Sequence, residues 1–186
     1  GKVTGGAKFT DDLTFEGMLQ ARVKRAGVPH AILRRMDVSK AQALPGVAAV
    51  ITAADLPGER NHGLVIPDWP VLIGVGERVR YVGDALALVA AETRQIATQA
   101  LDLIEVEFDL QPVVSDPVQA LRSDAPALHP SGNLLKHIKV RKGDVAAGFA
   151  QADVVLEHTF HTLSLEHAFL EPECSIARPT PDGRME

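Results

Sequence analysis

A twelve-residue stretch, SLEHAFLEPECS at residues 164–175, gathers the side chains best suited to chemistry. It contains three glutamates, one histidine and the chain's only cysteine. Such residues can hold a metal ion, exchange protons with a ligand, or stand at the polar end of a strand. Features of the rest of the sequence distinguish between these three interpretations.

Zinc binding is the first alternative, because six possible ligands fall within 17 residues: His158, His161, His167, Glu171, Glu173 and Cys174. On a strand predicted over 153–162, however, His158 and His161 would point to opposite faces. The metalloprotease pattern His-Glu-x-x-His is absent, because Glu166 precedes His167 and no second histidine follows four residues later. The spacing favours surface histidines on a strand, with a small zinc enzyme kept as an alternative.

Glu171 is the candidate for ligand binding. It lies between Leu170 and Pro172, at the edge of an apolar run. A carboxylate placed there is partly desolvated, which suits it to exchange hydrogen bonds or protons with a ligand. From the residues alone, a surface glutamate that ends a strand before proline is the favoured interpretation.

The composition excludes several classes of function. A net charge of −5 without a clustered basic face argues against a nucleic-acid partner. One cysteine permits no intrachain disulfide and no iron–sulfur cluster held by this chain alone, and it favours the reducing cytoplasm. No apolar run approaches the roughly 20 residues of a membrane helix. Gly74-Val75-Gly76 lacks the third glycine of a dinucleotide-binding loop, because Val79 occupies that position.

The elements that must position these residues follow from the apolar patterns, which predict a mixed α+β fold. Strands are predicted at 17–25, 28–37, 47–52 (buried), 85–91, 104–110, 136–141, 153–162 and 174–178. Helices are predicted after a Ser39–Gln42 capping box, over 93–104, after Asp116-Pro117, and over 144–150. Strand, helix and strand between 85 and 110 predict a βαβ-like crossover. Residues 53–80 are loop-rich, as functional segments often are, and 125–133 form a predicted linker.

Both ends of the sequence suggest a piece of a longer polypeptide. The first methionine is Met18, and Pro181-Asp182-Gly183-Arg184 predicts a hairpin turn with too few residues after it to form a properly paired strand. We therefore expect a fragment.

Three stretches together resemble the molybdenum-binding subunit of the xanthine dehydrogenase and aldehyde oxidase family. They are GGAKFTDDL (5–13) with VPHAILRRMDVSKAQALPGVAAVITAADLPG (28–58), VGDALALVAAETRQIATQALDLIEVEF (82–108), and EHAFLEPECSIA (166–177). The resemblance implies an α/β-hammerhead domain at residues 1–125. It also implies that residues 126–186 form a linker and the truncated beginning of the molybdopterin-binding domain.

The resemblance also implies roles for the opening stretch. Glu171 would bind a small-molecule substrate, with Glu166 and His167 as pocket support, while Cys174 would be a small packed residue. A glutamate here hints at a purine-like N-heterocycle, although Leu165 stands where xanthine-type members often have glutamine. The catalytic base and pterin loops of the family lie downstream, so no catalytic residue and no metal ligand is expected in this chain.

The implied chemistry is hydroxylation of a carbon centre with water, on a molybdenum–pterin cofactor that this chain alone would not hold. Iron–sulfur clusters and FAD, on other domains or subunits, would carry the electrons away. The expected partners are those domains and the remainder of the molybdopterin-binding domain. The alternative is a stand-alone, non-catalytic binding or scaffold protein that uses the hammerhead fold, because a fold does not fix a function.

Overall fold

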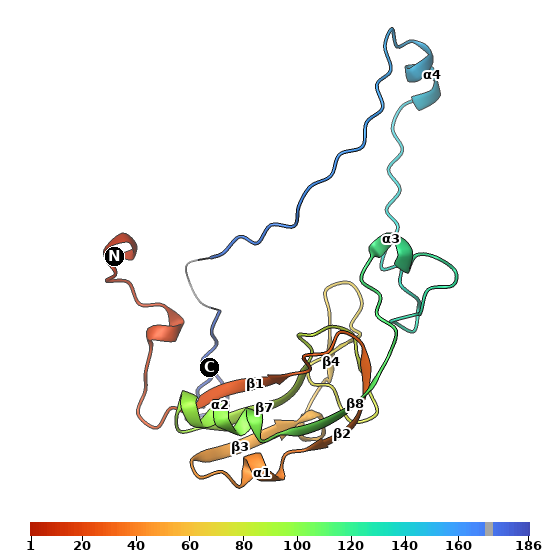
Figure 1. The fold of residues 1–186 in the computed structure, drawn as a ribbon. Coiled ribbons are helices and arrows are strands. Elements are labelled where there is room, and N and C mark those ends of the chain that lie inside the picture. The colour runs from red at the N-terminus through yellow and green to blue at the C-terminus, as the bar shows by residue number, and fades with distance from the viewer. Residues whose placement is uncertain (170–172) are drawn as a thin grey trace. The chain divides into compact units, whose positions relative to one another are not determined.

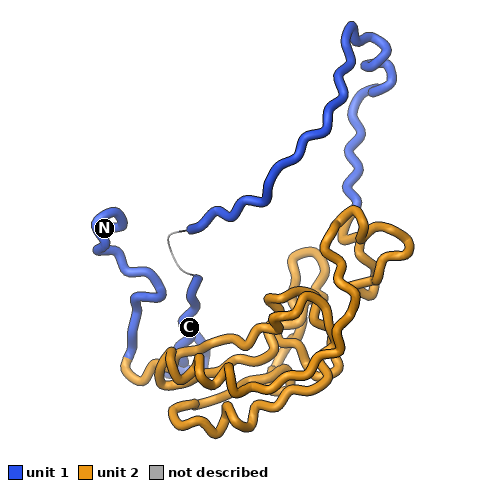
Figure 2. Tube along the Cα trace, in the orientation of Figure 1, with its two compact units in different colours: residues 1–15, 137–186 blue, residues 16–136 orange. Residues whose placement is uncertain are grey.

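The computed structural model describes residues 1–169 and 173–186 (Figure 1). The chain divides into two units, shown in different colours in Figure 2. One consists of Glu16–Lys136, and the other of Gly1–Phe15 with His137–Glu186. The described residues contain no helix that is long and apolar enough to cross a membrane.

The unit Glu16–Lys136 is built on two three-stranded antiparallel sheets. The first has the order β1 (Gln20–Arg25), β7 (Ala85–Ala91) and β3 (Val47–Thr52). The second has the order β6 (Arg78–Val79), β2 (Ala31–Asp37) and β8 (Glu105–Leu110). These findings confirm five of the predicted strands and the mixed α+β class.

The predicted βαβ crossover is wrong. A βαβ unit needs its two strands to run parallel in one sheet. Here β7 and β8 belong to different sheets, and each pairs antiparallel with its neighbours. The local strand, helix and strand pattern is right, but it does not determine which strands pair.

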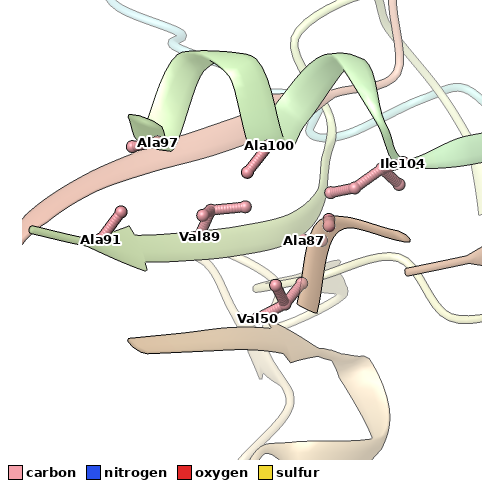
Figure 3. Close-up of a cluster of buried hydrophobic side chains, with 8 residues drawn as sticks. Val50, Ala87, Val89, Ala91, Ala97, Ala100 and Ile104 are labelled. Atoms are coloured by element: carbon pink, nitrogen blue, oxygen red, sulfur yellow. The ribbon is translucent and has the colours of Figure 1, made fainter. Parts of the chain in front are cut away.

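Strand β7 is the centre of the first sheet, and its sequence ALALVAA is mostly buried. Helix α2 (Arg94–Asp102) packs against β7 and β1. Figure 3 shows its Ala97 and Ala100 facing Val89 and Ala91 of the strand, with Ile104 closing the end of the cluster. Alanines at the contact allow the helix to approach the sheet closely, and dense packing of this kind stabilises the unit.

A second core cluster lies around Leu33, Ile73, Val79 and Leu86, all fully buried. Leu86 belongs to β7, whose residues Ala87, Val89 and Ala91 contribute to the first cluster. One strand therefore supplies side chains to both cores. Strand β3 is less buried than predicted, because only its Val50 is buried.

Two predicted helix starts have different outcomes. The Ser39–Gln42 capping box is wrong, because helix α1 (Ser39–Gln42) has Val38 as its N-cap and the Ser39 hydroxyl donates to Asp37 Oδ1 (2.7 Å). Helix α3 (Pro117–Ala120) begins as predicted: Asp116 accepts hydrogen bonds from the backbone N–H groups of residues 118 and 119.

The loop-rich segment 53–80 contains a 3-10 turn, η3 (Ala53–Asp55), and a small hairpin of β4 (Asn61–His62) and β5 (Trp69–Pro70). Its Gly74-Val75-Gly76 turn orients a carboxylate, since the Gly74 N–H donates to Glu77 Oε2 (2.7 Å). The same carboxylate accepts two hydrogen bonds from Arg60. Burial raises the pKa of Glu77, but the hydrogen bonds from Arg60 and Gly74 outweigh it, so the net pKa is lowered.

The second unit contains little regular structure. Its elements are η1 (Lys2–Thr4), η2 (Thr10–Asp12) and helix α4 (Val145–Ala150), whose predicted cap Asp144 accepts from the Ala147 N–H (2.9 Å). The strands predicted at 136–141 and 153–162 are not formed, because no neighbouring strand pairs with either segment in the described structure. Near the C-terminus a turn joins a single β-bridge, between Pro179 and Met185, in place of a strand at 174–178.

Candidate functional site

Glu171, the predicted substrate-binding residue, lies outside the described residues. Glu166 and His167 are both exposed. Glu166 Oε1 accepts hydrogen bonds from the backbone N–H groups of His167 (2.9 Å) and Ala168 (3.4 Å), and Ala168 has a positive φ of 51°. The His167 ring stacks on Phe169 with 5.5 Å between centroids. Glu166 therefore stabilises a local turn, and pocket support by these two residues stays a prediction.

The described candidates for metal ligation do not converge. Within the described ranges, no group of three His, Cys, Asp or Glu side chains lies close enough to hold a metal ion. His158 and His161 are exposed, and the His158 ring contacts Phe160 edge to face at 4.7 Å. The prediction that Cys174 is packed is wrong, because this side chain is exposed.

Cys174 lines an open cavity of about 340 Å³ within the second unit. The other lining residues come from the N-terminal segment and the C-terminal turn: Thr10, Leu13, Phe15, Ser175, Ile176, Arg178 and Glu186. The Arg178 guanidinium lies 5.7 Å from the Phe15 ring centroid and pairs with Glu186 at 2.6 Å. The hydrogen bond between these partners raises the pKa of Arg178 and lowers the pKa of Glu186. This cavity is an open surface feature and offers no enclosed site.

The molybdenum–pterin cofactor implied by the resemblance needs a cradle of converging polar groups. In the part of 137–186 that the structure describes, side chains are almost all exposed. Among the described residues, the one buried side-chain polar atom without a hydrogen-bond partner is Arg60 Nε, which belongs to the other unit. The described residues therefore do not fit the cofactor by themselves, and no chemical step is assigned to it in this chain.

A pocket of about 210 Å³ in the unit Glu16–Lys136 was missed by the sequence patterns. Its lining residues are Asp68, Trp69, Arg80, Tyr81, Asp84 and His129. They come from the β4–β5 hairpin, the turn between β6 and β7, and the segment predicted as a linker. The useful signal was the loop-rich stretch 53–80, which contains the chain's only tryptophan, Trp69, and is directly followed by its only tyrosine, Tyr81.

Asp84 forms the base of this pocket, and its side chain is buried. Its Oδ1 accepts a hydrogen bond from the Trp69 indole N–H (3.2 Å), and its Oδ2 accepts from the backbone N–H groups of Arg80 (2.6 Å) and Tyr81 (3.4 Å). Three donors therefore compensate the buried charge. The carboxylate fixes both the indole and the turn that carries the arginine.

Residues 126–133, predicted as part of a linker, form hydrogen bonds with other residues of the unit Glu16–Lys136. Arg80 Nε donates to the Leu128 carbonyl (3.0 Å), and His129 Nδ1 lies 2.5 Å from Asp68 Oδ2. The Asn133 side chain links parts of this region: it accepts a hydrogen bond from the Leu128 N–H and donates hydrogen bonds to the Ala120 and Pro126 carbonyls. These contacts complete one side of the pocket.

Comparisons with known proteins agree with this architecture. Residues 4–112 match the family described as "Aldehyde oxidase and xanthine dehydrogenase, a/b hammerhead domain", and residues 128–186 match "Molybdopterin cofactor-binding domain". The chain is 46% identical over 183 residues to a probable xanthine dehydrogenase subunit of Bacillus subtilis, covering 98% of this chain and 24% of that protein.

Two further relatives extend the comparison. The nicotinate dehydrogenase large molybdopterin subunit of Eubacterium barkeri is 40% identical over 186 residues, covering 99% of this chain and 43% of that protein. The aldehyde oxidoreductase structure from Desulfovibrio gigas superposes with a TM-score of 0.71 at 30% identity, covering 82% of this chain and 18% of the other. The chain thus spans less than half the length of these relatives. It belongs to the xanthine dehydrogenase and aldehyde oxidase family, with a hammerhead domain followed by part of a molybdopterin-binding domain.

Proposed function

We propose that the chain is the N-terminal part of the large, molybdopterin-binding subunit of a molybdenum hydroxylase. Residues 1–125 are its hammerhead domain, and residues 126–186 are a linker and the beginning of the cofactor-binding domain. The complete enzyme oxidises a carbon centre of a purine-like N-heterocycle or an aldehyde. Water supplies the oxygen atom, and two electrons and two protons leave.

The observation that carries this proposal is the apolar surface of the segment that matches the cofactor-binding domain. Large apolar side chains between 154 and 165 are strongly exposed: Val154, Val155, Leu156, Phe160, Leu163 and Leu165. So many exposed large apolar side chains within twelve residues are typical of a surface that packs against further protein. The rest of the molybdopterin-binding domain is the partner that this proposal assigns to it.

The remaining chemistry belongs to parts outside this chain. Other segments of the large subunit hold the molybdenum–pterin cofactor, and iron–sulfur clusters and FAD on separate domains or subunits take the electrons. This chain's single cysteine is too few for an iron–sulfur cluster of its own, and it favours a cytoplasmic enzyme. The proposal includes no nucleic-acid partner.

Within the complete enzyme, Glu171 hydrogen-bonds the substrate, with Glu166 and His167 beside it. The support is its position between Leu170 and Pro172, where an apolar neighbourhood strengthens a hydrogen bond to a ligand. The turn that Glu166 closes begins a few residues before Pro172. In this proposal the carboxylate forms part of one wall of the substrate pocket.

The test is the kinetics of Glu171→Gln in the complete enzyme. Glutamine keeps the shape and a carbonyl acceptor but removes the negative charge. Losing the charge-assisted part of the hydrogen bond to the substrate should lower kcat/KM by roughly 5- to 30-fold, equivalent to about 1–2 kcal/mol. Molybdenum content should stay unchanged, and Glu59→Gln, which changes an exposed glutamate of the unit Glu16–Lys136, serves as the control. Unchanged purine kinetics would refute the role of Glu171. If no complex of the complete protein contains molybdenum or has hydroxylase activity, the proposed enzymatic function is refuted and a binding or scaffold protein is favoured.

A further inference from the structure

The pocket of the unit Glu16–Lys136 combines two aromatic walls with one arginine. Trp69 and Tyr81 are exposed, and their rings lie 5.5 Å apart at an interplanar angle of 79°. Because they are nearly perpendicular, they form a corner in which a planar ring can lie flat on one wall and edge-on to the other. His62 stacks on Trp69 at 5.4 Å and 19°, which supports the indole.

Some hydrogen-bond donors of Arg80 are unused among the described residues. Its guanidinium Nε donates to the backbone carbonyl of Leu128 at 3.0 Å, and this bond fixes the direction of the guanidinium. Its two terminal nitrogens have no hydrogen-bond partner among the described residues. A guanidinium anchored through Nε is prepared to bind a carboxylate through its terminal nitrogens.

The acidic groups of the pocket are already paired. Asp84 accepts three hydrogen bonds from the indole and two backbone N–H groups. Asp68 pairs with His129, whose Nδ1 lies 2.5 Å from its Oδ2. Arg80 is therefore the charged lining group whose donors are still available, so the pocket favours a negatively charged ligand group.

The position of Tyr81 depends on a glycine. A Cβ at Gly83 would lie 2.3 Å from Tyr81 Cε2 and 2.9 Å from its hydroxyl oxygen, so the ring lies directly over residue 83. A larger residue would displace this wall without touching the arginine. The two recognition elements, aromatic and cationic, can thus be perturbed separately.

We propose that this pocket binds a small aromatic carboxylate, with the ring against Trp69 and Tyr81 and the carboxylate on the terminal nitrogens of Arg80. A cavity of about 210 Å³ has room for one small ring system. The inference goes beyond the proposed hydroxylase function, because it concerns a site on the hammerhead domain and holds for any function of the complete protein.

Trp69, the only tryptophan of the chain, makes a direct fluorescence titration possible. Benzoate added to the intact 186-residue chain, with excitation at about 295 nm, should produce a saturable change in emission. Benzamide, which has the same shape without the charge, should bind at least about tenfold more weakly. Cyclohexanecarboxylate, which keeps the charge without the aromatic ring, should bind several-fold more weakly.

Variants assign the response to the pocket. Arg80→Gln should weaken benzoate binding at least about tenfold, and Gly83→Ala by about threefold or more. Arg34→Gln removes an exposed arginine paired with Asp109 and should leave binding unchanged. An absent or non-saturable response, equal binding of benzoate and benzamide, or wild-type affinity in a folded Arg80→Gln variant would each overturn the proposal. If Arg80→Gln fails to fold, the comparison of benzoate, benzamide and cyclohexanecarboxylate on the wild-type chain still tests the proposal.

Discussion

Both units of this chain contain many apolar side chains, yet among the described residues only those of Glu16–Lys136 form a buried core. In Glu16–Lys136, the strands pair into two sheets and surround two clusters that include Leu33, Leu86 and Val89. In the other unit, residues as large as Leu156 and Phe160 are 90% and 83% exposed. The difference shows that an apolar strand pattern stabilises structure only when neighbouring strands are present to pair with it.

The largest expected effect is a matched pair of leucine truncations. Leu86→Ala should lower the free energy of unfolding by about 3 kcal/mol, because Leu86 is fully buried in a strand that serves both clusters. Leu156→Ala removes the same atoms from an exposed side chain and should change the free energy of unfolding by less than about 0.5 kcal/mol. Urea denaturation followed by circular dichroism measures both. Equal destabilisation by the two changes would contradict the contrast between the units.

A pair of glycines sharpens the same contrast through the backbone. Gly46 and Gly143 both have positive φ, of 85° and 72°. A Cβ at Gly46 would also lie 2.7 Å from Ile96 Cδ1, whereas at Gly143 nothing lies within 4 Å. Gly46→Ala should therefore cost about 1–2 kcal/mol in the same denaturation experiment, and Gly143→Ala should leave the transition where it is. A shift caused by Gly143→Ala would mean that its region unfolds together with the core.

Helix caps provide a smaller test. The Thr93 hydroxyl accepts from the Ile96 N–H (3.2 Å) at the start of α2, and Asp144 caps α4 in the other unit. Thr93→Ala should lower the melting temperature through a loss of about 1 kcal/mol, because α2 covers the core. Asp144→Ala should reduce the local helix signal without moving the main transition. The reverse order of effects would be inconsistent with a core restricted to Glu16–Lys136.

The smallest expected effect concerns pH. The lowered pKa of Glu77 means that its charged form stabilises the fold above the unfolded pKa of about 4.3, and that this contribution is lost as pH falls through the lower folded pKa. Because Arg60 and Glu77 are 41% and 36% exposed, solvent screening limits the contribution to about 1 kcal/mol or less. Glu77→Gln should therefore be less stable than wild type at neutral pH and converge with it in acid. Parallel stability curves over this range would rule out the assigned ionic contribution.

Local patterns predicted the elements of the hammerhead unit well. Three features depend only on neighbours in sequence and could be predicted from it: the continuous apolar run of β7, the helical face of α2 and the Asp116 cap. Sheet membership could not, because the pairing of β7 with β1 and β3, and of β8 with β2, depends on contacts far apart in the chain. The same limit explains the strands predicted at 136–141 and 153–162 that have no partner in the described structure.

The candidate sites also differ in how far the sequence could predict them. The family resemblance implied pocket roles for Glu166, His167 and Glu171. The structure shows Glu166 and His167 in one local turn, and all three roles stay predictions. The aromatic pocket escaped notice because Trp69, Arg80 and His129 are separated in sequence and meet only through the Asp84 and Leu128 contacts. Family resemblance supplied the hammerhead domain, which no single motif in the chain would have revealed.

Amide hydrogen exchange, measured by mass spectrometry on this chain and on the complete large subunit, tests most directly whether residues 137–169 acquire structure from the rest of the molybdopterin-binding domain. In this chain, the amides of β2 and β7 should be protected, and those of 137–169 should exchange at nearly the unfolded rate apart from weak protection in α4. In the complete large subunit, peptides from 153–163 should become strongly protected. Strong protection of 153–163 in this chain alone, or its absence in the complete protein, would contradict the proposed dependence.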